Sequence, residues 1–358
     1  MKAAVLKAFG SPLSVETIPD PVLGTGEVIV DVAAAGVAGY TALVFSGARN
    51  YLLELPVVPG PGGIGRVRAV GPDATRLKPG DWVSCDPTVR SRDDAVSPDI
   101  TLQGISARGD GGLKLQKHFH NGCYAEQMLV PTENVTPLGD FDPGEAPRWC
   151  SIGVLLVPYG GLLAVGFKAG ETLLVSGATG NFGGAGVAVA LAMGAGLVVA
   201  PGRNEAMLAS LRRRFGSRVR TVTLTGDEEA DCARMKEAAG RPIDVVLDLL
   251  PPSAGTKPVR AAAMTVRESG RVVLMGGVGM LGGDDLALPY PWIMRNNITV
   301  RGQWMYPREA SLHMIAMIRA GLIDLGNQEV TAFALKDINE AVAHAAKRKR
   351  TVVMPQLA

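Results

Sequence analysis

One glycine-rich segment has the residue types and the spacing needed to hold a phosphate group. Residues 173–184 read LLVSGATGNFGG, so an apolar strand runs into a Gly-x-x-Gly-x-x-Gly turn and then into a predicted helix. Glycines let the backbone turn sharply and approach a diphosphate, and the helix N-terminus offers free N–H groups and a partial positive charge. The predicted cofactor-binding residues here are Gly177, Ala178, Thr179, Gly180, Asn181, Phe182 and Gly183.

The alternative interpretation of this turn is a purely structural one, in which the glycines serve only close helix–sheet packing. A lone glycine motif is weak evidence, but this one opens a series of alternating strands and helices, the setting in which dinucleotide sites occur. We therefore predict dinucleotide binding.

The end of the next predicted strand indicates which nucleotide is bound. NAD sites usually place Asp or Glu there, where the carboxylate binds the ribose 2′-hydroxyl. This chain instead has Gly202, Arg203 and Asn204, with no carboxylate before Glu205. A guanidinium can pair with a 2′-phosphate, so NADP(H) is favoured over NAD(H). The alternative is that Arg203 is an ordinary solvated arginine.

The elements that must position these residues fall into two groups. Short β-rich runs bounded by Gly and Pro, such as Glu27–Ala33 and Gly65–Val70, predict a small barrel-like β domain near the N-terminus. From residue 170 to 302, strands alternate with helices, which predicts βαβ units and a doubly wound parallel sheet. Residues 91–121 are polar and are predicted to form a long loop or lid.

Three helices are expected later in the chain. Residues Ala261–Glu268 are predicted to be helical, and a last helix, Ile338–Ala346, is expected before a terminal strand, Thr351–Met354. An amphipathic helix is predicted after Pro307. Its apolar face is expected to carry Leu312, Ile315, Ala316 and Ile318.

Length and composition exclude several classes of protein. The 358 residues suggest two domains at roughly 150 residues each. Lys and Arg number 36 against 34 Asp and Glu, a balance too even for a protein that binds nucleic acid or an anionic membrane. Four scattered cysteines indicate reduced thiols, and Ala3–Leu6 is too short an apolar run for a signal peptide, so a cytoplasmic location is predicted.

Two uncharged segments raise the question of a membrane span, Cys150–Phe167 and Thr172–Gly202. The second contains the glycine-rich turn, whose broken backbone a lipid core would leave without hydrogen bonds. A buried strand, turn and helix explain the same absence of charge. We therefore expect no membrane span.

Several segments together resemble the medium-chain dehydrogenase/reductase superfamily, which includes alcohol dehydrogenases and quinone oxidoreductases. The resemblance extends over nearly the whole chain. Besides the glycine-rich turn it lies in MKAAV (1–5), GEVIV (26–30), AAGV (34–37), LPVVPG (55–60), KPGDWV (78–83) and INEA (338–341). It implies a GroES-like catalytic domain of residues 1–152 and 303–358 and a Rossmann NADP(H)-binding domain of residues 153–302. The active site would lie between the two domains, and the protein would form a homodimer or homotetramer.

The metal ligands of zinc-dependent members are missing. The positions that hold Cys, the His-Glu pair and a second Cys in those members are here Ala38, Pro61-Gly62 and Gly153 or Val154. None of these side chains can bind zinc, which needs Cys, His, Asp or Glu donors. The four cysteines of the family's structural zinc lobe are also absent from residues 90–121. We expect no zinc, and we interpret His118 and His120 as solvated residues.

Without zinc, hydrogen-bond donors, a protonated acid or water must meet the negative charge that develops on the substrate oxygen. The resemblance aligns Tyr40 with a Ser or Thr that relays protons in zinc members, so its phenol is the candidate acid, with an aromatic pocket wall as the alternative. The relay's distal His is Leu43 here. The resemblance also implies cofactor contacts for Gly276, Gly277, Val278, Gln303, Trp304, Met305 and Arg350.

The predicted function is that of a zinc-independent, NADPH-dependent oxidoreductase. It would transfer hydride to a small apolar or aromatic carbonyl, enone or quinone, with 1,2- and 1,4-reduction both open. The alternative is a non-catalytic nucleotide-binding protein, a redox sensor or structural protein that kept the fold and lost the chemistry.

Overall fold

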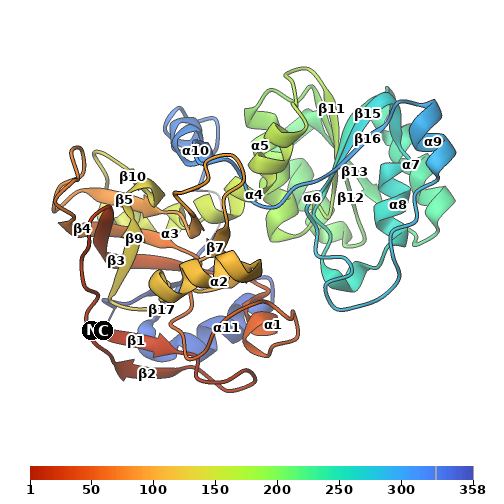
Figure 1. Cartoon of the computed structure of the whole chain (residues 1–358). Coiled ribbons are helices and arrows are strands. Elements are labelled where there is room, and N and C mark those ends of the chain that lie inside the picture. Colours follow the sequence, from red (N-terminus) through yellow and green to blue (C-terminus); the bar gives the residue numbers. More distant parts are fainter. Residues whose placement is uncertain (327–328, 358) are drawn as a thin grey trace. The chain divides into compact units, whose positions relative to one another are not determined.

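The chain divides into two compact units in the computed structural model, which describes residues 1–326 and 329–357 (Figure 1). Met1–Gly153 and Asp324–Ala358 form the first unit, and Val154–Ile323 forms the second. The predicted return to the first domain at residue 303 therefore differs from this division. Residues just after 303 pack on the second unit, where a Cβ at Gly160 would lie 2.4 Å from the carbonyl oxygen of Met305.

The second unit is built on a six-stranded parallel sheet in the order β13-β12-β11-β14-β15-β16. Its strands are β11 (Thr172–Ser176), β12 (Leu197–Gly202), β13 (Val219–Thr223), β14 (Ile243–Asp248), β15 (Val266–Leu274) and β16 (Thr299–Gly302). The chain leaves β11 toward one edge of the sheet and then crosses back to continue from β14 toward the other. The switch in direction lies between β11 and β14, which is the place where doubly wound sheets bind ligands. This confirms the predicted doubly wound α/β fold.

Helices connect the successive strands of this unit: α5 (Asn181–Ala192), α6 (Glu205–Phe215), α7 (Glu228–Ala239), α8 (Lys257–Ala263) and α9 (Tyr290–Arg295). Helix α4 (Ile152–Ala164) precedes the first strand, and α10 (Ala310–Arg319) follows the last. The uncharged segments are explained by α4 and by the buried strands β11 and β12 on either side of α5. Among the described residues, none of the helices has both the length and the apolar character that a bilayer span requires.

Two expectations for this unit are wrong in part. The helix predicted over Ala261–Glu268 ends as α8 at Ala263, because Val266 is buried and begins β15 by pairing with Ile243 of β14. On α10 the buried residues are Ala310, Ser311, Met314 and Ile315, whereas Leu312 is 58% exposed. The helix predicted after Pro307 is therefore present, but of its predicted apolar face Ile315 is buried and Ile318 half-buried, whereas Leu312 and Ala316 are exposed.

The first unit is built on a seven-stranded sheet, in which the C-terminal segment completes a sheet begun by the N-terminal one. The order is β10-β5-β4-β3-β18-β17, with β9 also on β3. The strands are β3 (Glu27–Val37), β4 (Gly63–Val70), β5 (Trp82–Cys85), β9 (Gln127–Pro131), β10 (Val135–Pro137), β17 (Thr331–Ala334) and β18 (Thr351–Met354). A separate pair, β1 (Lys2–Val5) and β2 (Ser14–Thr17), and the helices α1 (Thr41–Phe45), α3 (Ala146–Trp149) and α11 (Ile338–Ala346) complete the unit.

Residues 91–121, predicted to be a loop, contain regular structure. A three-stranded sheet is formed by β6 (Thr88–Arg90), β7 (Ile100–Leu102) and β8 (Ser106–Arg108), and α2 (Gly109–His118) follows it. Strands of three residues are too short to show an alternating pattern, and the buried Thr101 and Gln116 make the segment look polar in sequence. The loop prediction was therefore wrong.

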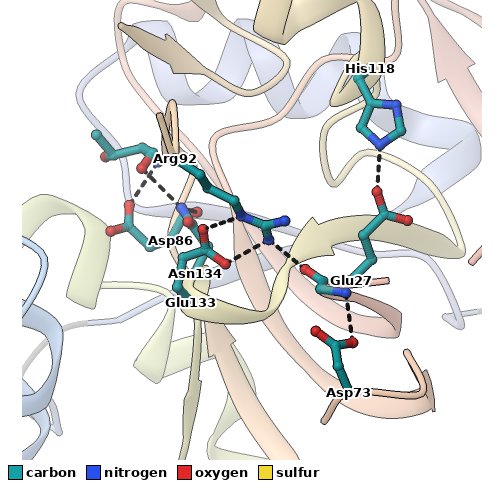
Figure 2. Close-up of polar contacts among 9 residues, drawn as sticks. Glu27, Asp73, Asp86, Arg92, His118, Glu133 and Asn134 are labelled. Carbon is teal, nitrogen blue, oxygen red and sulfur yellow. Dashed lines mark hydrogen bonds and ion pairs between the residues drawn. The ribbon is translucent and has the colours of Figure 1, made fainter. Parts of the chain in front are cut away.

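Polar side chains hold this segment by binding backbone carbonyls. Figure 2 shows the buried Asn134, whose Nδ2 donates to the carbonyl oxygens of Asp86 and Thr88 at 2.8 and 2.9 Å. Gln103, also buried, donates through Nε2 to the carbonyl oxygens of Asn121 and Leu129, both at 2.7 Å. Because the acceptors are main-chain oxygens, these hydrogen bonds do not depend on the side chains of the accepting residues.

Ion pairs add to these contacts at the surface. Arg92 binds Glu133 at 2.8 Å and donates to the carbonyl oxygen of Gly26 at 2.6 Å, and His118 pairs with Glu27 (Figure 2). The interpretation of His118 as merely solvated is thus incomplete. Within residues 1–326 and 329–357, no group of three or more His, Cys, Asp or Glu is arranged to hold a metal.

Asn134→Ala should destabilise the first unit, because two buried carbonyls lose their donor. We expect a loss of about 2 to 3 kcal/mol in the free energy of unfolding, measured by urea denaturation. The neighbouring Glu133→Gln removes only a partly exposed ion pair and should cost less than about 1 kcal/mol. Equal losses in the two variants would contradict this account of the segment.

Candidate functional site

The glycine-rich turn joins β11 to α5, and its glycines are required by close backbone approaches. Gly177 has φ +86°, a conformation that L side chains rarely adopt, and a Cβ there would lie 3.0 Å from the carbonyl oxygen of Leu249. A Cβ at Gly183 would lie 2.0 Å from the carbonyl oxygen of Gly177. The Gly180 N–H donates to that same carbonyl at 2.8 Å. The turn therefore folds back on itself with no room for side chains.

The start of α5 places its first backbone N–H groups at the end of the glycine-rich turn. Gly180 precedes the helix in an extended conformation and provides no side-chain cap. The first N–H groups of a helix lack partners within the helix, and the helix dipole adds a partial positive charge there. Thr179, Asn181 and Phe182 are half-buried around this turn, while Ala178 is buried beneath it. An anionic group such as a diphosphate fits this environment.

A second turn from the other half of the sheet lies next to the first. Gly276 follows β15, and a Cβ there would lie 2.4 Å from Oδ2 of Asp248, the last residue of β14. The Gly277 N–H donates to the carbonyl oxygen of Leu250 at 2.8 Å. The structure thus places the predicted residues Gly276, Gly277 and the half-buried Val278 at the same edge of the sheet as the glycine-rich turn.

Asp248 also belongs to this edge of the sheet, although no sequence motif indicated it. Its side chain is 3% exposed, and its Oδ1 has no hydrogen-bond partner among the described residues. Burial raises the pKa of Asp248 to about 7, although hydrogen bonds from Leu250 and Ser176 act in the opposite direction. The available signal was the carboxylate that ends the strand Ile243–Asp248, after three consecutive apolar residues and next to the switch point.

The end of β12 lies against the glycine-rich turn, as expected for a site that reaches the adenine ribose. A Cβ at Gly202 would lie 2.6 Å from Cγ2 of Thr179. Arg203 is exposed, and among the described residues it makes no hydrogen bond or ion pair. Asn204 has a structural role, because its Oδ1 accepts from the Met207 N–H at 3.0 Å and caps α6. Of these three residues, Arg203 is the one with a side chain free to meet a phosphate.

Residues 303–305 continue from the end of the sheet. The Gln303 N–H donates to the carbonyl oxygen of Leu274, the last residue of β15, at 3.1 Å. Trp304 is 39% exposed, and Met305 has φ +62°. Gln303 is therefore close in space to the turn after β15, and the predicted contacts of all three residues with a nicotinamide stay predictions.

Tyr40 and Arg350 lie in the first unit. The Tyr40 ring is half-buried at the start of α1, and the Arg49 guanidinium lies 4.4 Å from its centroid. Burial, together with Tyr51, raises the pKa of Tyr40 to about 12, and Arg49 opposes this shift. The phenol therefore stays protonated and is a weaker acid than a solvated tyrosine. Arg350 donates to Ser151 Oγ at 3.1 Å. The expected roles of Tyr40 and Arg350 stay predictions.

The residues at the expected zinc position do not fit a zinc ion. Gly62 has φ +78°, and a Cβ there would lie 2.2 Å from the carbonyl oxygen of Cys85. Cys123 Sγ donates to the carbonyl oxygen of Gly62 at 2.9 Å, and burial raises the pKa of Cys123 well above its ordinary value. Burial also raises the pKa of Cys85 and Cys150 to about 12. Among the described residues these cysteines form no group of three or more His, Cys, Asp or Glu that could hold a metal.

Comparison with known proteins connects both units to one group of enzymes. The alcohol dehydrogenase GroES-like domain matches residues 24–140, and the zinc-binding dehydrogenase family matches residues 182–320. An alcohol dehydrogenase from Moraxella sp. (strain TAE123) is 28% identical over 95% of this chain and 94% of its own length. An acryloyl-coenzyme A reductase from Metallosphaera sedula is 28% identical over 81% of both chains. A Sinorhizobium meliloti 1021 protein solved bound to NADP has the same fold, with a TM-score of 0.80, 21% identity and 99% coverage of both chains.

Gly183→Ala should destabilise the free protein strongly, because the new methyl group would contact backbone that cannot move without opening the turn. We expect a loss of about 3 kcal/mol in the free energy of unfolding. The adjacent Gly184→Ala is the matched control. Its Cβ would lie 3.6 Å from the carbonyl oxygen of Ala178, an ordinary contact, and alanine favours a helix by up to about 1 kcal/mol. Urea denaturation without nucleotide should separate the two variants, and similar stabilities would contradict the close approach.

Proposed function

The chain belongs to the medium-chain dehydrogenase/reductase superfamily, and on that premise we propose that it is a zinc-independent, NADP(H)-dependent oxidoreductase acting on a carbonyl, enone or quinone. The observation that carries the proposal is the glycine-rich turn at the switch point of a doubly wound sheet, with Arg203 in place of a carboxylate at the end of β12. A site of this kind binds the diphosphate of a dinucleotide through backbone N–H groups.

In this proposal the residues of the second unit bind and orient the nucleotide. The N–H groups at the start of α5 bind the diphosphate, and Arg203 pairs with the 2′-phosphate. The turn Gly276–Val278 and residues 303–305 hold the nicotinamide end. When bound, the reduced nucleotide supplies a hydride. The missing side chains at Gly177 and Gly183 are what allow the backbone to turn beneath the diphosphate.

The replacement of zinc donors by Ala38, Pro61-Gly62 and Gly153 or Val154 bears on the substrate. Negative charge on the substrate oxygen has to be met by hydrogen-bond donors, and a conjugated enone or quinone spreads that charge over several atoms. The similarity to an acryloyl-coenzyme A reductase favours a conjugated alkene, whereas the similarity to alcohol dehydrogenases favours a ketone or aldehyde. Tyr40 is the proposed proton donor because the resemblance aligns it with the proton-relaying Ser or Thr of zinc members. Its raised pKa keeps the phenol protonated but makes it a weaker acid, which suits a slow or assisted proton transfer.

The purified protein should consume NADPH with at least one member of a panel of enones, quinones and ketones. It should do so equally well after treatment with a chelator, and elemental analysis should show no stoichiometric zinc. One zinc per chain, or activity lost on chelation and restored by zinc, would contradict the metal-free assignment. Tight NADPH binding without turnover of any substrate would instead support a non-catalytic nucleotide-binding protein.

Arg203→Ala should weaken NADPH binding by roughly tenfold or more, because one charge-assisted contact to the 2′-phosphate is lost. Binding of NADH, which lacks that phosphate, should change by less than about twofold. Arg213→Ala, at an exposed arginine of α6, is the matched control and should leave both affinities unchanged. Nucleotide fluorescence titrations measure both constants, and equal losses for the two nucleotides would refute the role of Arg203.

A further inference from the structure

The carboxyl group of Asp248 is buried at the switch point of the sheet. The diphosphate binding proposed above uses backbone N–H groups and does not involve this carboxyl. We propose that Asp248 is a proton-linked positioning residue of the nucleotide site: nucleotide binds preferentially to the protein with a neutral Asp248 carboxyl, and binding to the ionised form takes up a proton. This inference rests on the nucleotide binding proposed above. It adds that the affinity for the nucleotide depends on whether the Asp248 carboxyl is protonated.

The position of Asp248 ties together the strand ends that form the site. Asp248 pairs with Ser176 across β14 and β11, and Ser176 is the residue directly before the glycine-rich turn. The Leu249 N–H donates to the Ser176 carbonyl oxygen at 3.1 Å, and the Met275 N–H donates to the Asp248 carbonyl oxygen at 3.1 Å. A Cβ at Gly276 would lie 2.4 Å from Asp248 Oδ2. Asp248 therefore adjoins the glycine-rich turn through Ser176 and the turn after β15 through Gly276.

The surroundings of the carboxyl favour its neutral form. Oδ1 is buried and accepts no hydrogen bond from the described residues, so burial disfavours a negative charge there. The groups that face the carboxyl are the Ser176 hydroxyl and the Leu250 amide, and neither is charged. Burial outweighs both hydrogen bonds and raises the pKa of Asp248 to about 7. Near neutral pH the free protein is thus a mixture of both forms.

A bound diphosphate shifts this mixture. Its negative charge beside the strand end disfavours a second negative charge on Asp248 and raises the pKa of that carboxyl further. By linkage, ionisation of Asp248 weakens nucleotide binding by the same factor. Affinity is therefore highest at pH values below the pKa of the free protein. It falls as pH rises toward the pKa of the complex, and over that interval binding takes up a proton.

The experiment compares wild type with Asp248→Asn, whose amide imitates the neutral carboxyl. NADPH dissociation constants are measured by nucleotide fluorescence from pH 6 to 9, and proton uptake is measured by calorimetry in buffers of different ionisation enthalpy. We expect the wild-type dissociation constant to rise roughly three- to tenfold relative to that of Asp248→Asn across this range. The excess proton uptake should be absent from the variant. The 2′-phosphate of NADPH titrates in the complexes of both proteins. The ratio of the two dissociation constants at each pH therefore reports the contribution of Asp248 alone.

Two further variants separate this effect from a change in packing. Ser176→Ala removes a hydrogen bond that favours the charged carboxyl, so the pH at which affinity falls should move upward. Asp231→Asn is the control for a buried aspartate elsewhere in the unit: Asp231 accepts hydrogen bonds from Thr225 and Gly226 near α7. Its pH profile should match wild type. Thermal unfolding of each variant without nucleotide checks that it is folded.

The outcomes distinguish this inference from the proposed function. If neither wild type nor any variant shows saturable NADPH binding at any pH, the proposed function fails. Saturable binding with the same pH profile and proton uptake in wild type and Asp248→Asn overturns the role of Asp248 and leaves the proposed function intact. Should Asp248→Asn not fold, an unchanged midpoint in Ser176→Ala also overturns the inference, and an upward shift supports it.

Discussion

The candidate site depends on a backbone turn that contacts its own carbonyl group. The first turn of α5 approaches Gly177 so closely that a methyl group at residue 183 would overlap the oxygen of that glycine. This approach places the start of α5 directly above the end of β11, and the sheet order then places the ends of β14 and β15 beside it. Because these elements come from both halves of the sheet, the site exists only when the whole unit is folded.

The sequence predicted this part of the molecule well, because its signals are local. The turn at Gly177–Gly183 is read from consecutive residues, and the alternation of strands and helices predicts a parallel sheet. The terminal elements Ile338–Ala346 and Thr351–Met354 agree with the predicted bounds, since their periodic pattern is short and uninterrupted. Arg203 was identified from its place at a strand end, and the structure places it there, exposed.

What the sequence did not reveal depends on contacts between distant residues. Thr101 and Gln116 are polar yet buried, so the segment from 91 to 121 resembled a loop. Gln116 accepts from the distant Glu54 N–H, whereas Thr101 donates to the carbonyl oxygen of Ser106 within the small sheet. The core-facing side of α10 depends on its neighbours rather than on the number of its apolar residues. Asp248 became notable only when the order of the strands placed it beside Ser176. The roles of Tyr40 and Arg350 came from resemblance, which supplies a position but no local geometry.

Charge around the site follows one pattern. The start of α5 and the exposed Arg203 are positive, and the one carboxyl buried at the switch point is disfavoured as an anion by its surroundings. Such an arrangement attracts a polyanion without a lysine-rich surface, which agrees with the balanced overall charge of +2. Affinity in such a site comes from oriented backbone dipoles rather than from net charge.

The manner in which Asn134 and Gln103 hold the first unit affects how its sequence can diverge. Both amides donate to main-chain oxygens, so their binding partners at Asp86, Thr88, Asn121 and Leu129 are selected by backbone position. Substitutions at those four positions leave the accepting oxygens in place, whereas the two amides themselves have no equivalent replacement. Over evolutionary time the accepting positions can therefore change within the limits of their own packing, since Asp86 and Thr88 are buried, while the two internal amides stay constant.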